Sequence, residues 1–358
     1  MKRLVPVMLA LCLLLSGCAT LFDGRYTHVE PHKIQGGQQG EENISAYNYD
    51  GLCRALISLA ESGAQSGIIS VPEYDQNQLR WDIDRAVQHT MQTSPIAAWA
   101  VENISCEMGA SGGQSAVAVT ITYIHDRVEI NKIRKVGDLE NARGAIAGVL
   151  DECGTGVVLL LQNYAETDFA QMVEDHADNS PQTVMETPQT VVNIYPQEGT
   201  TRLVELKFTY QTSRDTLRSM QTQVRSVFDS ATIFVSGYST EAEKYERLYS
   251  FLMDFLVEGN LQLKTSITPA YSLLRHGVGN ERAFATVYAA MCREAGLQCH
   301  VIGGTYQGNP RYWNMVCIDG VYSHLDLLRC NLEGKFQTFA DGQMNDYYWD
   351  YDIFPAGR

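Results

Sequence analysis

Hydrophobic and polar positions repeat in the same order twice along the first two thirds of this chain. Residues 50–71 show an amphipathic pattern, a glycine-containing turn and a short apolar run, and residues 141–160 show the same succession. Leu52, Leu56 and Leu59 recur at intervals of three and four, as on one face of a helix. This shared order predicts an internal duplication.

Two later signals extend the repeat. Each copy contains a Ser-Pro pair, at Ser94-Pro95 and Ser180-Pro181, and then an alternating strand that ends in Thr-Tyr. Alternation is typical of strands with one covered face, so each copy is predicted to be an α-β-α-β-β unit. The units are predicted to cover residues 46–135 and 136–235, with helices near 47–63, 78–92, 140–152 and 166–177, strands at 117–123 and 203–210, and a closing helix near 214–229.

A third region is predicted at residues 236–358. Ser239 or Thr240 can cap a helix, and Tyr245, Leu248 and Leu252 then follow at helical spacing. A two-copy repeat region followed by a separate mixed region places the chain in the α+β class.

The first residues read as a bacterial lipoprotein signal. Lys2 and Arg3 precede an apolar run of 12 residues, which is too short to span a bilayer as a helix. Leu15-Ser16-Gly17-Cys18 fits a lipobox. We therefore expect removal of residues 1–17, a lipid such as palmitate on Cys18, and a linker over residues 18–45. The predicted location is extracytoplasmic, anchored to a bacterial membrane through that lipid.

Charge and cysteine content narrow the possible functions. The formal net charge of −15 argues against nucleic acid as a partner. We expect the seven cysteines beyond Cys18 to be mainly free and buried, although Cys292 and Cys299 could form a disulfide. No Cys/His spacing indicates a metal site, and the sequence suggests no cofactor.

The strongest motif lies within residues 270–328. Its ordered anchors include Phe284-Ala285, Trp313-Asn314, Asp319-Gly320 and His324-Leu325-Asp326. This stretch resembles the core of the transglutaminase-like superfamily, which implies a papain-like fold for the third region.

The resemblance also places the catalytic positions of that family. The Cys of the family falls on Glu281, the His falls on Arg311, and the Asp is kept as Asp326. A carboxylate is a weak acyl nucleophile, and an arginine stays protonated and cannot act as a general base. No catalytic residue is therefore expected. A salt bridge of Arg311 with Glu281 and Asp326 is predicted instead, and its loss in Glu281→Ala should cost roughly 3–5 kcal/mol, softened by Asp326.

Three functions remain open from the sequence. The first is a non-catalytic surface lipoprotein with a binding or scaffolding role, whose cleft would take a peptide or cell-wall fragment near Tyr271, Trp313, Asn314 and His324. The second is a hydrolase of peptides or glycans that uses Glu281 and Asp326 as acid and base, although Arg311 between them favours the ionised form of both. The third is a purely structural module without an open groove.

Overall fold

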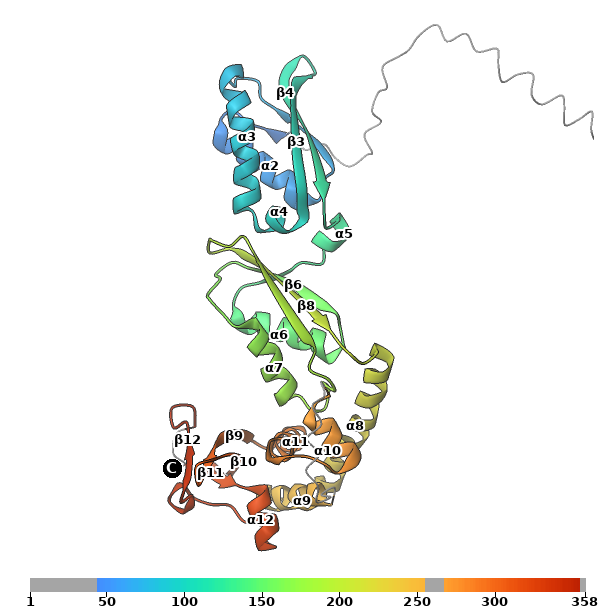
Figure 1. Ribbon diagram of the computed structural model, residues 1–358, viewed down its shortest axis with the longest axis vertical. Helices are drawn as coiled ribbons and strands as arrows, with labels where there is room; N and C mark the ends of the chain where they lie inside the picture. The colour runs from blue at the N-terminus through green and yellow to red at the C-terminus, as the bar shows by residue number, and fades with distance from the viewer. Residues whose placement is uncertain (1–43, 255–266, 355–358) are drawn as a thin grey trace, which may run out of the picture. The chain divides into compact units, whose positions relative to one another are not determined.

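The structure is a computed structural model that describes residues 44–254 and 267–354 (Figure 1). The predicted signal peptide, Cys18 and nearly all of the predicted linker lie outside the described residues. Within the described ranges, no helix is both long enough and apolar enough to cross a membrane. Mixed helices and strands confirm the α+β class.

The first unit is a four-stranded sheet with the order β1-β2-β4-β3. Its short first strand runs parallel to β2, and the other neighbours are antiparallel. Asn48 caps the first helix by accepting from the Gly51 N–H at 2.9 Å, and Gly63 ends that helix in the left-handed conformation. The elements are β1 (Ile44–Ser45), α2 (Tyr49–Ser62), β2 (Ser66–Ser70), α3 (Gln76–Thr93), α4 (Pro95–Ala100), β3 (Val101–Ser111), β4 (Gln114–Tyr123) and α5 (Arg127–Ile130).

The second unit has the equivalent strand order, β5-β6-β8-β7, with the same parallel and antiparallel neighbours. The predicted helices and strands are therefore present in both units. Each unit also begins with a short parallel strand that the sequence analysis did not predict. The elements are β5 (Arg134–Val136), α6 (Leu139–Asp151), β6 (Gly156–Leu161), α7 (Phe169–Asn179), β7 (Gln189–Tyr195) and β8 (Arg202–Thr209).

The two Ser-Pro pairs make related contacts. In the first unit, the Ser94 hydroxyl donates to Glu61 at the end of α2, at 2.8 Å. In the second unit, Ser180 lies 3.3 Å from Nδ1 of His176, whose Nε2 lies 2.8 Å from Asp151 at the end of α6. In both units the serine is thus tied to a carboxylate at the end of the first helix. Shared topology and this shared contact favour duplication, which itself stays a prediction.

The C-terminal region has a sheet with the order β11-β10-β9-β12, in which all neighbours are antiparallel. One helix, α11, packs against this sheet, and four further helices of the region contact α11. Its elements are α8 (Arg214–Val235), α9 (Glu241–Met253), α10 (Pro269–His276), α11 (Glu281–Glu294), β9 (Cys299–Tyr306), β10 (Asn309–Ile318), β11 (Val321–Leu325), α12 (Leu327–Glu333), the 3₁₀ turn η1 (Asp341–Gln343) and β12 (Tyr347–Trp349).

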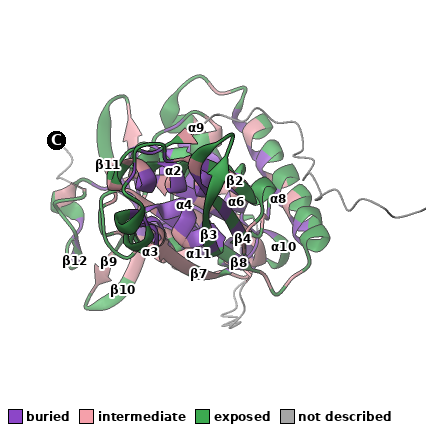
Figure 2. Ribbon diagram, turned by 90° about the horizontal axis from the view of Figure 1, so that it is seen from above, coloured by how far each residue is buried: buried purple, intermediate pink, exposed green. Residues whose placement is uncertain are grey.

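The core of this region surrounds α11. An unbroken run from Ala283 to Cys292 is buried, because helices and the sheet cover different sides of this helix. Helix α8 buries Leu217, Val224 and Phe228 in the same apolar cluster, while its other face is exposed (Figure 2). The helix that the sequence analysis assigned to the second unit therefore also contributes to the C-terminal core, and a boundary near residue 235 falls inside that core.

The cysteines of the described region are free thiols, and five of these seven are buried. Cys292 and Cys299 both lie in the C-terminal core, and no disulfide joins them. The possible disulfide between them is therefore absent from the structure.

Candidate functional site

The start of α11 positions Glu281. Gly277 ends α10 in the left-handed conformation, and Asn280 caps α11 by accepting from the Ala283 N–H at 2.9 Å. Glu281 is therefore the first residue of the helix, where unpaired backbone N–H groups favour a negative charge. This local geometry holds the carboxylate beside β10.

Arg311 on β10 joins the two predicted carboxylates. Its Nη1 donates to Oε1 of Glu281 at 2.6 Å. Its Nε and Nη2 donate to the two oxygens of Asp326 at 2.9 Å and 2.8 Å. The predicted contact is thus present, and the pairing with Asp326 is bidentate, as suits a planar guanidinium.

Asp326 is the buried centre of the group. It follows β11 and caps α12, where its Oδ1 accepts from the Arg329 N–H at 3.0 Å. Its Oδ2 also accepts from the Tyr347 hydroxyl at 2.8 Å. The carboxylate is 1% exposed, and four hydrogen bonds satisfy its two buried oxygens.

Tyr347 is a site residue that the sequence analysis missed. Its strand, β12, pairs with β9 and thereby brings the C-terminal segment back to Asp326. Gly304 permits this approach, because a side chain there would collide with the Tyr348 carbonyl and the Trp313 ring. Burial, and then the Asp326 charge, raise the pKa of Tyr347, so its hydroxyl stays protonated and donates. The clustered aromatic residues of the C-terminal segment were the available signal, and they do not by themselves indicate this hydrogen bond.

The positive charge of Arg311 is fixed. Burial alone would lower the pKa of Arg311, but Asp326 and Glu281 outweigh burial and raise it. Arg311 therefore remains a cation that cannot accept a proton. Its side chain is 15% exposed and that of Glu281 is 33% exposed, so only the Glu281 edge of the group is open to solvent.

Three residues proposed from the sequence to bind a ligand lie in the core instead. Trp313, Asn314 and His324 are all 0% exposed. The Asn314 amide donates to the Ala285 carbonyl at 2.8 Å and so ties β10 to α11. Trp313 packs edge-on against Tyr347 and Trp349. The C-terminal segment covers Trp313 and His324, and α11 covers Asn314, so these side chains offer no surface to a ligand.

His324 is held as a neutral imidazole. Trp313 Nε1–H donates to its Nδ1 at 3.0 Å, so the ring proton must sit on Nε2, which lies 3.0 Å from Asp341. A second ring proton would face the indole N–H. Burial lowers the pKa of His324, and the opposing effect of Asp341 is smaller.

This arrangement predicts a loss of stability in mild acid. An unfolded histidine binds a proton as the pH falls below about 6.5, whereas the folded His324 does not until a lower pH. The unfolded state then binds more protons, so the free energy of unfolding should fall between pH 7 and pH 5.5. Urea denaturation at these two pH values checks this, and His324→Gln should show a flatter dependence. An equal dependence in parent and variant would assign the effect to other groups.

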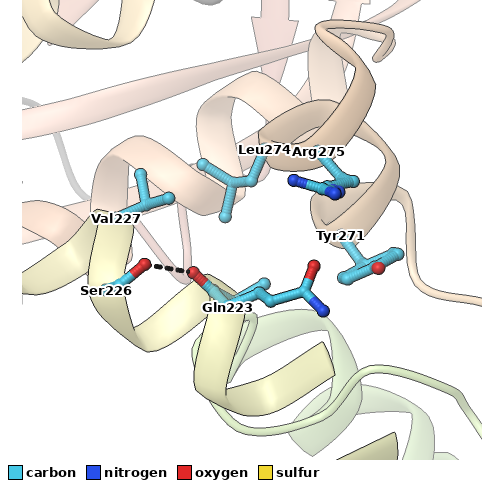
Figure 3. Close-up of a pocket in the computed structure, with 7 residues that line it drawn as sticks. Gln223, Ser226, Val227, Tyr271, Leu274 and Arg275 are labelled. Carbon is cyan, nitrogen blue, oxygen red and sulfur yellow. Dashed lines mark hydrogen bonds between the residues drawn. The ribbon is translucent and has the colours of Figure 1, made fainter. Parts of the chain in front are cut away.

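The fourth proposed binding residue, Tyr271, lies elsewhere. It is on α10 and lines a cavity of ≈ 170 Å³ together with residues of α8 (Figure 3). The structure does not bring Tyr271 into contact with the group around Arg311. A ligand in this cavity would be held by different chemistry.

The described residues offer no other evident nucleophile at the site. Burial raises the pKa of Cys292 well above that of an ordinary thiol, so it carries little thiolate. Cys299 is 3% exposed and lies in the same core. Within the described ranges, no cluster of His, Cys, Asp and Glu is arranged to hold a metal ion.

Comparisons with known proteins identify the C-terminal region. Residues 229–327 match the Transglutaminase-like superfamily. A search of curated proteins gave no significant match. Among solved structures, similarity is found to a TGase crystal structure, with 9% identity, a TM-score of 0.26 and coverage of 62% of this chain and 63% of that one.

Two further solved structures are similar over different lengths. One is a candidate protease from Parabacteroides distasonis, with 11% identity, a TM-score of 0.25 and coverage of 72% of this chain and 39% of that one. The other is a candidate cysteine protease from Cytophaga hutchinsonii, with 13% identity, a TM-score of 0.26 and coverage of 48% and 70%. This chain spans less than two thirds of the length of the TGase and the first protease. By its family match, residues 229–327 of this chain form a transglutaminase-like domain.

Proposed function

We propose that this protein is a non-catalytic, membrane-anchored member of the transglutaminase-like group with a binding or scaffolding role. The observation that carries the proposal is the fixed Arg311. It stands where the resemblance puts a catalytic histidine, and two carboxylates hold it as a cation. A group that cannot accept a proton cannot activate a nucleophile or protonate a leaving group in turn.

The same contacts argue against a hydrolase mechanism that uses Glu281 and Asp326 as acid and base. Such a mechanism needs one protonated and one ionised carboxyl group on either side of a substrate. Here Arg311 occupies the space between the two groups and donates to both. Both carboxylates accept hydrogen bonds from the same guanidinium, which favours a structural role for the three residues.

Membrane attachment through Cys18 is part of the proposal and is supported by the lipobox in the sequence. A lipid anchor would keep the described region at a bacterial membrane surface outside the cytoplasm. The ligand would be a peptide or a cell-wall fragment presented at that surface. Such a ligand suits a domain that keeps the framework of a peptide-processing fold without its chemistry.

Purified full-length protein tests the proposal. We expect no release of ammonia from glutamine peptides in the presence of an amine, and no hydrolysis of peptides or glycans, above the rate in buffer. A cysteine transglutaminase serves as the positive control. Activity in the parent that Glu281→Gln abolishes would overturn the non-catalytic assignment. Metabolic labelling in cells that produce the protein tests the anchor. A palmitate analogue should label the parent and leave Cys18→Ser unlabelled; equal labelling would remove the anchor from the proposal.

A further inference from the structure

The cavity between α8 and α10 has an apolar floor and a polar rim. Val224, Val227 and Leu274 form the floor, and they belong to or pack against the apolar core. Gln223, Ser226, Tyr271 and Arg275 line the rest. Figure 3 shows the Gln223 amide extending toward Tyr271, with the Arg275 guanidinium on the same side of the groove. Hydrogen-bond donors from two helices therefore surround a small apolar depression.

Arg275 differs from Arg225 in its ion pairing. Arg225 on α8 is paired with Asp229 at 2.9 Å and with Glu294 at 3.0 Å. In contrast, no carboxylate of the described residues forms an ion pair with Arg275. The exposed guanidinium is available to a carboxylate from outside the protein.

We propose that this groove binds the C-terminal residue of a peptide that ends in an apolar side chain. The terminal carboxylate pairs with Arg275. The apolar side chain packs on Val224, Val227 and Leu274, and the Gln223 amide and Tyr271 hydroxyl are placed to bond the last peptide group. This site lies outside the Glu281–Arg311–Asp326 group, so it goes beyond the proposed function and can fail independently of it.

The size of the cavity selects this class of ligand. Pockets for whole small molecules usually enclose about 300–1,000 Å³, and this one measures ≈ 170 Å³. It has room for one end of a chain and not for a long alkyl tail. The two uncharged polar side chains beside Arg275 suit a peptide group, which a fatty acid lacks. These features favour a peptide terminus over a lipid carboxylate.

Ligand-observed NMR titration of the full chain in detergent tests the proposal. The probes are N-acetylalanylleucine, its C-terminal amide, and octanoate. We expect millimolar binding of the first probe, and an affinity lower by about tenfold or more for the amide, because an ionic hydrogen bond is lost. Arg275→Gln should lower the affinity for the first probe to a similar extent and leave the affinity for the amide unchanged.

Arg218→Gln is the matched control, since Arg218 is an exposed arginine on α8 that does not line the cavity. This variant should bind N-acetylalanylleucine with a dissociation constant within about twofold of that of the parent. Binding of the probe to detergent micelles is the same for every variant, so it does not affect the comparison. Equal binding of acid and amide, no binding of the acid, or an equal loss in both arginine variants would overturn the site. Octanoate binding as tight as that of the peptide, with the same dependence on Arg275, would overturn the peptide assignment.

Discussion

Replacing Asp326 by asparagine is expected to lower the free energy of unfolding by about 3–5 kcal/mol, because it removes one partner of a buried ion pair. The Asp326 carboxylate is 1% exposed and accepts from Arg311 twice, from the Tyr347 hydroxyl and from the Arg329 N–H. An asparagine amide is neutral and has one acceptor oxygen. Arg311 would keep one carboxylate on its exposed side and lose the partner on its buried side.

The corresponding change at Glu281 should cost less. Glu281 is 33% exposed and accepts one hydrogen bond from Arg311, at 2.6 Å, so water can replace this contact in Glu281→Gln. Arg311 then keeps its bidentate partner. We expect a loss of about 1 kcal/mol, which is below the cost that the sequence alone suggested for Glu281→Ala. The structure therefore assigns most of the stabilisation to Asp326.

A matched control separates the ion pair from helix capping. Asp168 caps α7 by accepting from the Gln171 N–H at 2.9 Å, and this is the same kind of contact that Asp326 makes to Arg329. Asparagine caps helices about as well as aspartate, so Asp168→Asn should be nearly neutral. Urea denaturation of the three variants gives the comparison. Similar losses for Asp326→Asn and Asp168→Asn would mean that capping, and not the pairing with Arg311, accounts for the role of Asp326.

The site could be predicted largely because its members lie on ordered anchors within one short region. The anchors from Phe284 to Trp313 and on to Asp326 carry the resemblance to the transglutaminase-like superfamily, and that resemblance implies that positions 281, 311 and 326 face one another. The charges of the residues at these positions then indicated how they would pair. The helices of the repeat units were also readable, since their apolar faces recur at regular spacing. Local pattern and chemistry agreed in these places.

Packing between segments far apart in the sequence could not be predicted from these local patterns. Trp313 and His324 are buried because the C-terminal segment returns to the sheet, with Phe339 bonded to His324 and β12 paired with β9. Asn314 is buried against α11 instead. The sequence of the strands that carry these residues does not indicate that another segment packs over them. The strands β1 and β5 are two and three residues long, too short to display a period. The face of α8 was predictable as amphipathic, but an amphipathic face does not say which core it joins.

Glu281→Cys is expected to create a reactive thiol. The sulfur would stand at the first residue of α11, beside a guanidinium that Asp326 continues to hold. Both the helix N-terminus and a neighbouring cation stabilise a thiolate and lower its pKa, to about 6 from the ordinary value of about 8.5. At pH 6 the thiolate fraction then rises roughly 150-fold, while a thiolate of lower pKa is intrinsically about tenfold less nucleophilic. The net gain in the rate of alkylation is about tenfold.

The native thiols give a low background for this measurement. Burial raises the pKa of Cys53, Cys153, Cys292 and Cys330, and raises that of Cys106 to about 11. Alkylation by iodoacetamide at pH 6, followed by mass spectrometry of the peptide around residue 281, isolates the new thiol from the remaining cysteines.

Two further variants identify the cause of the reactivity. Glu241→Cys places a thiol at the first residue of α9, where the native Glu241 contacts the Asp319 N–H and no arginine. It shares the helix terminus but lacks the cation, so it should react more slowly than Glu281→Cys. Combining Glu281→Cys with Arg311→Gln should slow the reaction to the rate of that control. If the double variant stayed as fast as Glu281→Cys, Arg311 would not be the group that stabilises the anion at position 281. If all three thiols reacted alike, this end of α11 would have lost the electrostatic character that the resemblance to cysteine enzymes implies.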